Sequence, residues 1–252
     1  MNRTRDELAP PERGRTDRGG NDVSAVSAPA IGSLPVTETE SVLISLACML
    51  EQRDSHTAGH CERLAYSAVA LGAAMRLDSE SLLSLYVGGY LHDVGKVSIP
   101  DSVLFKPGKL NAGEWSIMRA HPVRGEAICR PLISLGRVLP LIRHHHERWD
   151  GTGYPDGLRG TKIPLLARIV QVVDIYDALT NPRPYKQAFT GARALEILQE
   201  ESDRGWRDRE IAGLFIRLQQ ANLSASPLDI GPEKVPPTLV TSLRNLQMQL
   251  TH

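Results

Sequence analysis

Two polar residues, His92 and Asp93, stand side by side at the end of an apolar stretch in the segment LHDVGKVSIP, residues 91–100. A neutral imidazole binds a divalent transition metal through one lone pair, whereas a carboxylate has two oxygens and can bridge two metals. Both groups are costly to bury without a partner. The pair therefore indicates a metal site if other histidine and aspartate side chains reach it.

Further candidate ligands are spread from residue 60 to residue 174. The segment IRHHHERWDG carries His144 to His146, whose side chains diverge by about 100° on a helix and can reach two metals, or one metal and solvent. A polar surface turn explains such a run equally well. His60 and His121 offer further imidazoles, although a lone histidine is more often a hydrogen-bonded structural residue.

Asp174 lies in the middle of the apolar segment ARIVQVVDIYDALT. A carboxylate buried there requires a cation or a dense set of hydrogen bonds, and a metal ion would satisfy it. The alternative is a helix face shifted by a residue or two, which leaves Asp174 facing water.

Helical periodicity predicts the elements that position these residues. Val42, Leu43, Leu46 and Leu50 recur at helical spacing and are expected on one apolar face. Asn111 and Glu114 form a capping-box pattern that opens a helix running toward His121. Strand-like alternation is nearly absent, so an all-α fold is expected. The expected helices cover residues 42–50, 64–75, 82–91, 111–121, 132–147 (despite Pro140), 164–179, 192–201 and 207–221.

Composition excludes several classes of function. The 29 Lys and Arg residues balance 29 Asp and Glu residues, so no overall basic field favours DNA or an anionic membrane. Cys48, Cys61 and Cys129 lack the CxxC spacing of a zinc-thiolate site and are odd in number, which argues against a disulfide framework and favours a reducing cytoplasm. No apolar run approaches the roughly 18 residues that span a bilayer.

Three regions are expected along the chain. Residues 1–36 mix charges with Gly, Pro and Ser and are predicted to be a disordered tail. Residues 37–221 form the folded domain. Residues 222–252 are expected to form a Pro-rich connection and a short helix from about Leu239 to Leu250. This helix would pack either on the domain or on a partner subunit, so a homodimer is one of the possible assemblies.

Four motifs follow one another in the order of a known family: HDVGKVSIPDSVLFKPGKLNAGEW, HPVRGEAI, HHERWDGTGYPDGLRGTKIPLLARI and DIYDALTNPRPYK. Over about residues 40–220 the chain resembles the HD-GYP family, the cyclic di-GMP phosphodiesterase branch of the HD phosphohydrolase superfamily. The resemblance implies an HD-domain bundle of about seven or eight helices.

The resemblance also implies a ligand set. The implied metal ligands are His60, His92, His121, His145, His146 and Asp174, with Asp93 as the bridging carboxylate. The site is then expected to hold two or three divalent metals, most often iron and otherwise manganese. His56 stands where family members with a third metal have a glutamate, so a third ion there stays open. His144 has no implied role and is expected at the surface.

Substrate contacts follow from the same resemblance. Lys96 is implied beside the metals, as a catalytic and substrate-binding residue, and Arg183 and Lys186 at the substrate phosphates. The Gly-rich loop of residues 150–160 contains Tyr154, a candidate substrate contact. This loop is implied in folding, in substrate access or in docking GGDEF-type cyclase domains, and the sequence does not decide among them.

The expected reaction is in-line attack on cyclic di-GMP by a metal-bridging hydroxide, giving pGpG first, and a second cleavage to GMP stays open. Two alternatives stay open. One is a cyclic di-GMP receptor or partner-docking module without turnover, and the other is an HD hydrolase of a different cyclic dinucleotide.

Overall fold

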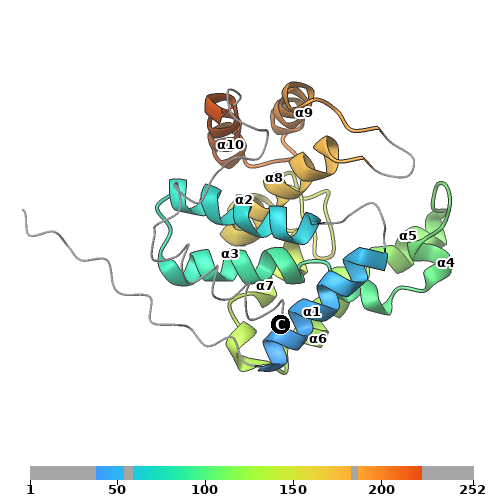
Figure 1. Cartoon of the computed structure of the whole chain (residues 1–252). Helices are drawn as coiled ribbons and strands as arrows, with labels where there is room; N and C mark the ends of the chain where they lie inside the picture. Colours follow the sequence, from blue (N-terminus) through green and yellow to red (C-terminus); the bar gives the residue numbers. More distant parts are fainter. Residues whose placement is uncertain (1–37, 54–58, 183–186, 223–252) are drawn as a thin grey trace, which may run out of the picture. The chain divides into compact units, whose positions relative to one another are not determined.

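The computed structural model of the chain describes residues 38–53, 59–182 and 187–222, and this part contains helices and loops but no strand (Figure 1). The expectation of an all-α fold is therefore confirmed. The predicted N-terminal tail and C-terminal helix lie outside the described residues, as do His56, Arg183 and Lys186.

The α-helices are α1 (Glu38–Arg53), α2 (His60–Ala74), α3 (Ser79–Leu91), α4 (Asp101–Leu104), α5 (Ala112–Met118), α6 (His121–Cys129), α7 (Leu139–His144), α8 (Leu165–Thr180), α9 (Gly191–Asp203) and α10 (Arg209–Asn222). Three short 3-10 helices are η1 (Val94–Ser98), η2 (Ile133–Leu135) and η3 (Gly160–Lys162). The 3-10 helices and α4 are only three to five residues long, and periodicity, which predicts eight longer segments, does not predict them as separate elements.

A pair of helices, α2 and α3, forms the centre of the domain (Figure 1). Their backbones come close because Gly89 faces Ala65, where a Cβ would lie 2.5 Å from the Ala65 Cα. Helix α8 packs against both, and α9 and α10 pack on α8. Leu64, Leu85 and Ile169 are completely buried between these helices. This packing fixes the ends of α2, α3 and α8 relative to one another.

Prolines set two helix boundaries that periodicity misplaced. The capping box of Asn111 and Glu114 is present as expected, but α5 ends at Met118 and His121 begins a new helix, α6. Pro122 lies in the first turn of α6, where its missing N–H costs nothing, whereas it would clash inside a continuous helix. Pro140 likewise lies in the first turn of α7, so the expected helix over 132–147 is reduced to η2 and α7.

The expected apolar face of α1 is only partly correct, because Leu43 packs against the core but two of its other members do not. Val42 and Leu46 are 56% and 51% exposed, while Ile44 and Ala47 are buried in the core. Helix α1 carries apolar residues on two faces, and periodicity alone does not show which face the rest of the domain covers.

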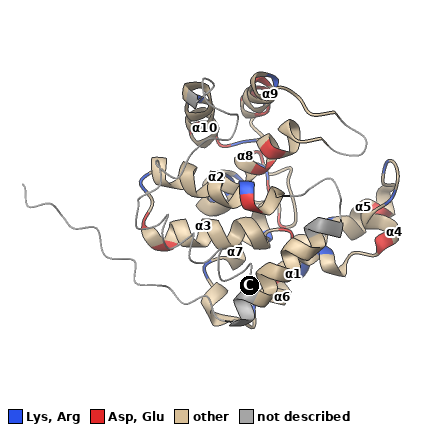
Figure 2. Cartoon of the chain, in the orientation of Figure 1, with Lys and Arg blue, Asp and Glu red and all other residues tan. Residues whose placement is uncertain are grey.

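Charged residues are interspersed over the helices, and Figure 2 shows no large region of one sign. This agrees with the equal numbers of acidic and basic residues. Among the described helices, none combines the length and the apolar character that crossing a membrane requires.

Candidate metal centre

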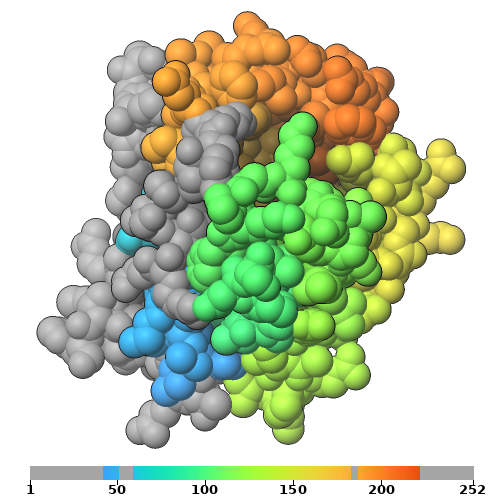
Figure 3. Space-filling view, turned by 90° about the vertical axis from the view of Figure 1, so that its right-hand side faces the viewer, coloured from blue at the N-terminus to red at the C-terminus, as the bar shows by residue number. Residues whose placement is uncertain are grey.

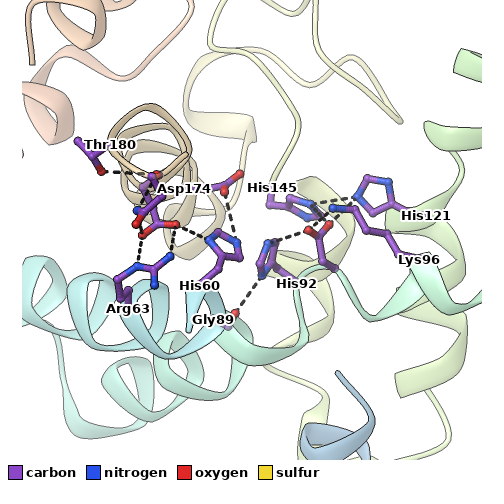
Figure 4. A network of polar contacts seen from close by, with 12 residues as sticks. His60, Arg63, Gly89, His92, Lys96, His121, His145, Asp174 and Thr180 are labelled. Carbon is purple, nitrogen blue, oxygen red and sulfur yellow. Dashed lines mark hydrogen bonds and ion pairs between the residues drawn. The ribbon is translucent and has the colours of Figure 1, made fainter. Parts of the chain in front are cut away.

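The candidate ligands lie mostly at helix ends that meet at one point (Figure 4). His60 is the first residue of α2, and His121 is the first residue of α6. His92 and His145 are the C-terminal caps of α3 and α7, which place Asp93 and His146 next in the chain. Helix ends suit such a site because their side chains project beyond the packed helix body.

Two groups of side chains share Asp93. In one group Asp93 lies with His121, His145 and His146, and in the other it lies with His60 and His92. Within each group the possible ligand atoms lie within 4.8 Å of one another. Asp93 Oδ1 is 3.1 Å from His121 Nε2, and Asp93 Oδ2 is 3.2 Å from His92 Nε2. Each oxygen of this carboxylate thus faces a different group.

Asp174 also reaches the centre. Its Oδ1 lies 3.6 Å from His60 Nε2, and its side chain is 22% exposed. The carboxylate of α8 that is fully inside the domain is Asp177, one helical turn further along, with 3% exposure. Asp174 is therefore neither a surface residue nor an isolated buried charge.

Backbone carbonyls orient three of the imidazoles. His92 Nδ1 lies 2.9 Å from the Gly89 carbonyl, His121 Nδ1 lies 2.8 Å from that of Met118, and His145 Nδ1 lies 2.7 Å from that of Ile142. A carbonyl can only accept, so each Nδ1 carries a proton and donates it. The Nε2 atoms are consequently the ones turned toward the centre.

The donor set fits a divalent transition metal. His92 Nε2 and Asp93 Oδ1 are buried and lack a hydrogen-bond partner within the described part of the chain. Unsatisfied buried acceptors are costly, and a cation between them removes that cost. Imidazole nitrogens and carboxylate oxygens suit several divalent metals, so the residues do not select one.

Burial and neighbouring charges set the protonation of the ligands. Burial raises the pKa of Asp93, but Lys96 and His92 outweigh burial and hold that pKa well below its usual value. Burial lowers the pKa of His145 to about 4 and brings that of His146 well below its usual range. These groups are therefore in the unprotonated form that metal binding requires at neutral pH.

Lys96 reaches the centre from a 3-10 turn that follows α3. Helix α3 ends at Leu91 and the chain continues as η1, which places Lys96 Nζ 2.5 Å from Asp93 Oδ2. The neighbouring Gly95 packs against α6, where a Cβ would lie 1.9 Å from the His121 carbonyl oxygen. The glycine thus allows η1 and α6 to approach, and the lysine lies beside the shared carboxylate.

Tyr154 stacks on His146, and the centroids of the two rings are 4.8 Å apart. The guanidinium of Arg119 lies 5.4 Å from the Tyr154 ring centroid. Glu147, which is fully buried, accepts hydrogen bonds from the backbone N–H groups of Asp156 (2.7 Å) and Leu158 (3.0 Å). Glu147 therefore anchors the loop that carries Tyr154.

His144 differs from the expected surface residue. Its side chain is only 13% exposed and lies with Glu147 and Asp156 in a third group of potential ligands. Arg143 already donates two hydrogen bonds to Asp156, at 2.7 and 2.8 Å. Because that guanidinium neutralises the carboxylate, this group is an ion-pair network.

Sequence reasoning missed Asp177 and Glu147, two buried carboxylates around the centre. Asp177 accepts from His60 and from Arg63, and although burial raises its pKa these bonds lower the pKa below its usual value. Both residues lie inside motifs that carry the family resemblance, DIYDALTNPRPYK and HHERWDGTGYPDGLRGTKIPLLARI, but no role was predicted for either.

Paired histidine and aspartate groups at converging helix ends are the arrangement of a metal-dependent HD domain. The family model described as "HD domain" matches residues 45–211, and the chain belongs to this family. The cyclic di-GMP phosphodiesterase response regulator RpfG of Xanthomonas campestris pv. campestris (strain 8004) is 42% identical over 71% of this chain and 48% of that protein. These findings confirm the resemblance seen in the sequence motifs.

A second relative is the 3'3'-cGAMP-specific phosphodiesterase 3 of Vibrio cholerae serotype O1, 34% identical over 68% of this chain and 38% of that protein. Among solved structures, a cyclic GMP-AMP-specific phosphodiesterase of V. cholerae aligns with a TM-score of 0.60 and 18% identity, covering 84% of this chain and 59% of that one. That likeness supports the fold. The chain spans about half or less of the length of these two curated relatives.

Proposed function

We propose that this protein is a metal-dependent phosphodiesterase that hydrolyses cyclic di-GMP to pGpG and then to GMP. The observation that carries the proposal is the pair of ligand groups sharing Asp93, with the positive charge of Lys96 on the same carboxylate. The substrate is taken from the 42% identical relative, whose name specifies cyclic di-GMP.

Two divalent ions, iron or manganese, are part of the proposal. His60, His92 and Asp174 would hold one ion, and His121, His145 and His146 the other, with Asp93 shared. When bound, such ions supply Lewis-acid neutralisation of the phosphodiester and lower the pKa of water toward neutrality. His56 is the candidate ligand of a third ion.

The chain's own residues complete the site. Lys96 is about one-third exposed, so its ammonium can approach both Asp93 and an incoming phosphate and offset negative charge on the phosphoryl oxygens. Arg183 and Lys186 are proposed to hold the substrate phosphates. The half-buried Tyr154, fixed on His146, would limit where the nucleotide lies.

A second candidate substrate is another cyclic dinucleotide, because one relative at 34% identity is named for 3'3'-cGAMP. The assay that decides uses the full chain, purified without oxygen and loaded with iron or manganese, and compares cyclic di-GMP, 3'3'-cGAMP and cyclic di-AMP. We expect the highest kcat/KM for cyclic di-GMP, with pGpG appearing before GMP. Binding without product from fully loaded protein would instead favour a receptor.

Asp93→Ala is the matching variant for that assay. It should lose bound metal and turnover together, because both groups use this carboxylate. Asp203→Ala, which removes an exposed carboxylate on α9, is the control and should change neither. Unchanged activity in Asp93→Ala would refute the bridging role.

Two partner proposals accompany the activity. Thr152, Asp156 and Arg159 are exposed on the loop of residues 150–160, which supports docking of a GGDEF-type domain there. The exposed side chains of Val42 and Met49 on α1 support self-association as a homodimer. Sedimentation of the protein alone and with a GGDEF protein tests both.

A further inference from the structure

His60 differs from the other oriented imidazoles of the centre in what holds its ring. His92, His121 and His145 each donate from Nδ1 to the carbonyl three residues earlier. His60 is the first residue of α2 and follows Gly59, whose backbone is left-handed with φ of 75°. Its Nδ1 instead lies 2.6 Å from Oδ2 of Asp177, which is 117 residues away in the sequence.

Two carboxylates of α8, Asp174 and Asp177, flank the His60 ring, and Figure 4 shows Asp174 beside His60. Asp174 Oδ1 is 3.6 Å from Nε2, on the metal side, and Asp177 Oδ2 is 2.6 Å from Nδ1, on the opposite side. Residues three apart on a helix lie on the same side of it, so one face of α8 supplies both contacts.

Asp177 is itself held in place. Arg63 donates to Oδ1 from Nε at 2.7 Å and to Oδ2 from Nη2 at 3.2 Å, and Asn181 Nδ2 lies 3.0 Å from Oδ1. The side chain of Asp177 is only 4% exposed. A buried carboxylate with this many donors keeps one orientation, and it therefore fixes the ring of His60 as well.

We propose that Asp177 is a positioning residue for metal binding, which holds the proton of His60 on Nδ1 and increases the electron donation of Nε2 to a divalent metal. A carboxylate behind a metal-bound imidazole orients the ring and strengthens the ligand. Among the oriented imidazoles of the described site, His60 alone has such a charged acceptor, so the group containing His60 and His92 is the one affected. This inference rests on the metal centre in the proposed function and deepens it.

The primary test is a manganese titration of the full-length protein by calorimetry. Asp177→Asn should weaken the binding of one ion by roughly 10- to 100-fold and leave the other ion unchanged. Asp208→Asn is the matched control, since Asp208 is also a buried carboxylate bonded to an arginine, with Arg168 Nη1 at 2.6 Å. It should leave both manganese affinities unchanged, and equal affinities in wild type and Asp177→Asn would overturn the inference.

A second background shows whether Asp177 acts through His60. In His60→Ala protein, adding Asp177→Asn should produce no further loss of manganese affinity. An equal loss in both backgrounds would mean that the residue acts through the fold, and would overturn the inference.

Wild-type protein with ¹⁵N-labelled histidine gives a test that does not depend on whether a variant folds. With zinc bound, ¹⁵N NMR should show His60 protonated at Nδ1 and bound through Nε2, and binding through Nδ1 would contradict the inference. Protein that binds zinc or manganese but cleaves no cyclic dinucleotide would contradict the proposed function alone, so the two failures are distinguishable.

Discussion

Asp93 is the residue on which the site depends most. Oδ1 faces His121 and His145, at 3.1 and 3.7 Å, while Oδ2 faces His92 and Lys96. An asparagine would present only one oxygen and could not serve both groups. The HD dipeptide thus places one imidazole and the shared carboxylate in adjacent positions at the end of α3.

Lys96→Met tests the role of the ammonium group. We expect turnover of the cyclic dinucleotide to fall by roughly 10²- to 10³-fold, because the charge that offsets the phosphoryl oxygens is lost. Metal content should stay the same, since Lys96 offers no lone pair while protonated. Lys109→Met, at an exposed position, is the control, and equal kcat values in the two variants would contradict the role.

At the residue scale the sequence identified the residues that line the centre and missed those that hold them. His92, Asp93, His121, His145 and His146 are polar groups at helix ends in an apolar context, which is a local signal. Asp177 has no local signal of this kind, because its partner His60 is 117 residues away. Glu147 was missed because its carboxylate accepts hydrogen bonds from backbone N–H groups of a loop. The amino-acid sequence does not show which backbone N–H groups a side chain will meet.

The contact between η1 and α6 decides whether the two ligand groups can share Asp93. Gly95→Ala would place a Cβ 1.9 Å from the His121 carbonyl and 2.5 Å from the Gly125 nitrogen. The overpacking should lower the free energy of unfolding by about 1–3 kcal/mol. It should also reduce the amount of bound metal, because Asp93 and His121 lie on either side of the contact.

Gly113→Ala is the control for that variant. Gly113 lies in the first turn of α5, and the nearest atom to an added Cβ is 3.4 Å away. Thermal unfolding and metal analysis of both variants check the prediction. Normal stability and full metal content in Gly95→Ala would show that η1 and α6 can separate without disturbing the centre.

Arg143 joins α6 to the loop that follows α7, and its contacts predict an acid-dependent loss of stability. Its hydrogen bonds hold the pKa of Asp156 below the ordinary 3.8. Burial raises the pKa of Glu126, but Arg143 and Arg130 outweigh burial and hold it below 4.5. Lowered carboxyl pKa values stabilise the fold above the ordinary values, and this stability is lost as the pH falls through the folded values.

The melting temperature of the wild type should therefore fall as the pH drops below about 4.5, and it should fall less steeply in Arg143→Gln. At neutral pH the Arg143→Gln substitution should lower the free energy of unfolding by about 1 kcal/mol. Arg193→Gln, in an exposed pair with Glu196, should leave the pH profile unchanged. Identical profiles for wild type and Arg143→Gln would contradict the assignment.

At the element scale, helix type and the approximate positions of the longer helices were predictable because apolar spacing is local, whereas the short helix α4 (Asp101–Leu104) was not predicted. Helix boundaries near prolines were less predictable. Pro122 and Pro140 are each compatible with a break between helices or with the first turn of a helix, and tertiary packing determines which of the two forms. The exposed face of α1, with Val42 and Leu46, shows a further limit, since burial depends on which helices lie nearby.

Across the whole molecule, the candidate ligands come from α2, α3, α6, α7 and α8 or from the residues directly after them. A metal bound by segments so far apart in sequence binds only the folded state. Bound metal should therefore add about 2.7 kcal/mol of stability at a concentration 100 times its Kd. Calorimetric scans with manganese and with a chelator check this, and a shift of equal size in Asp93→Ala would contradict it.

The central claim is that distant helix ends hold two metal ions around one aspartate. Anomalous diffraction from crystals of the manganese-loaded protein measures this directly. The account predicts two peaks that share the Asp93 carboxylate, one beside His60 and His92 and the other beside His121, His145 and His146. A single peak away from Asp93, or peaks only at the group of His144, Glu147 and Asp156, would contradict it.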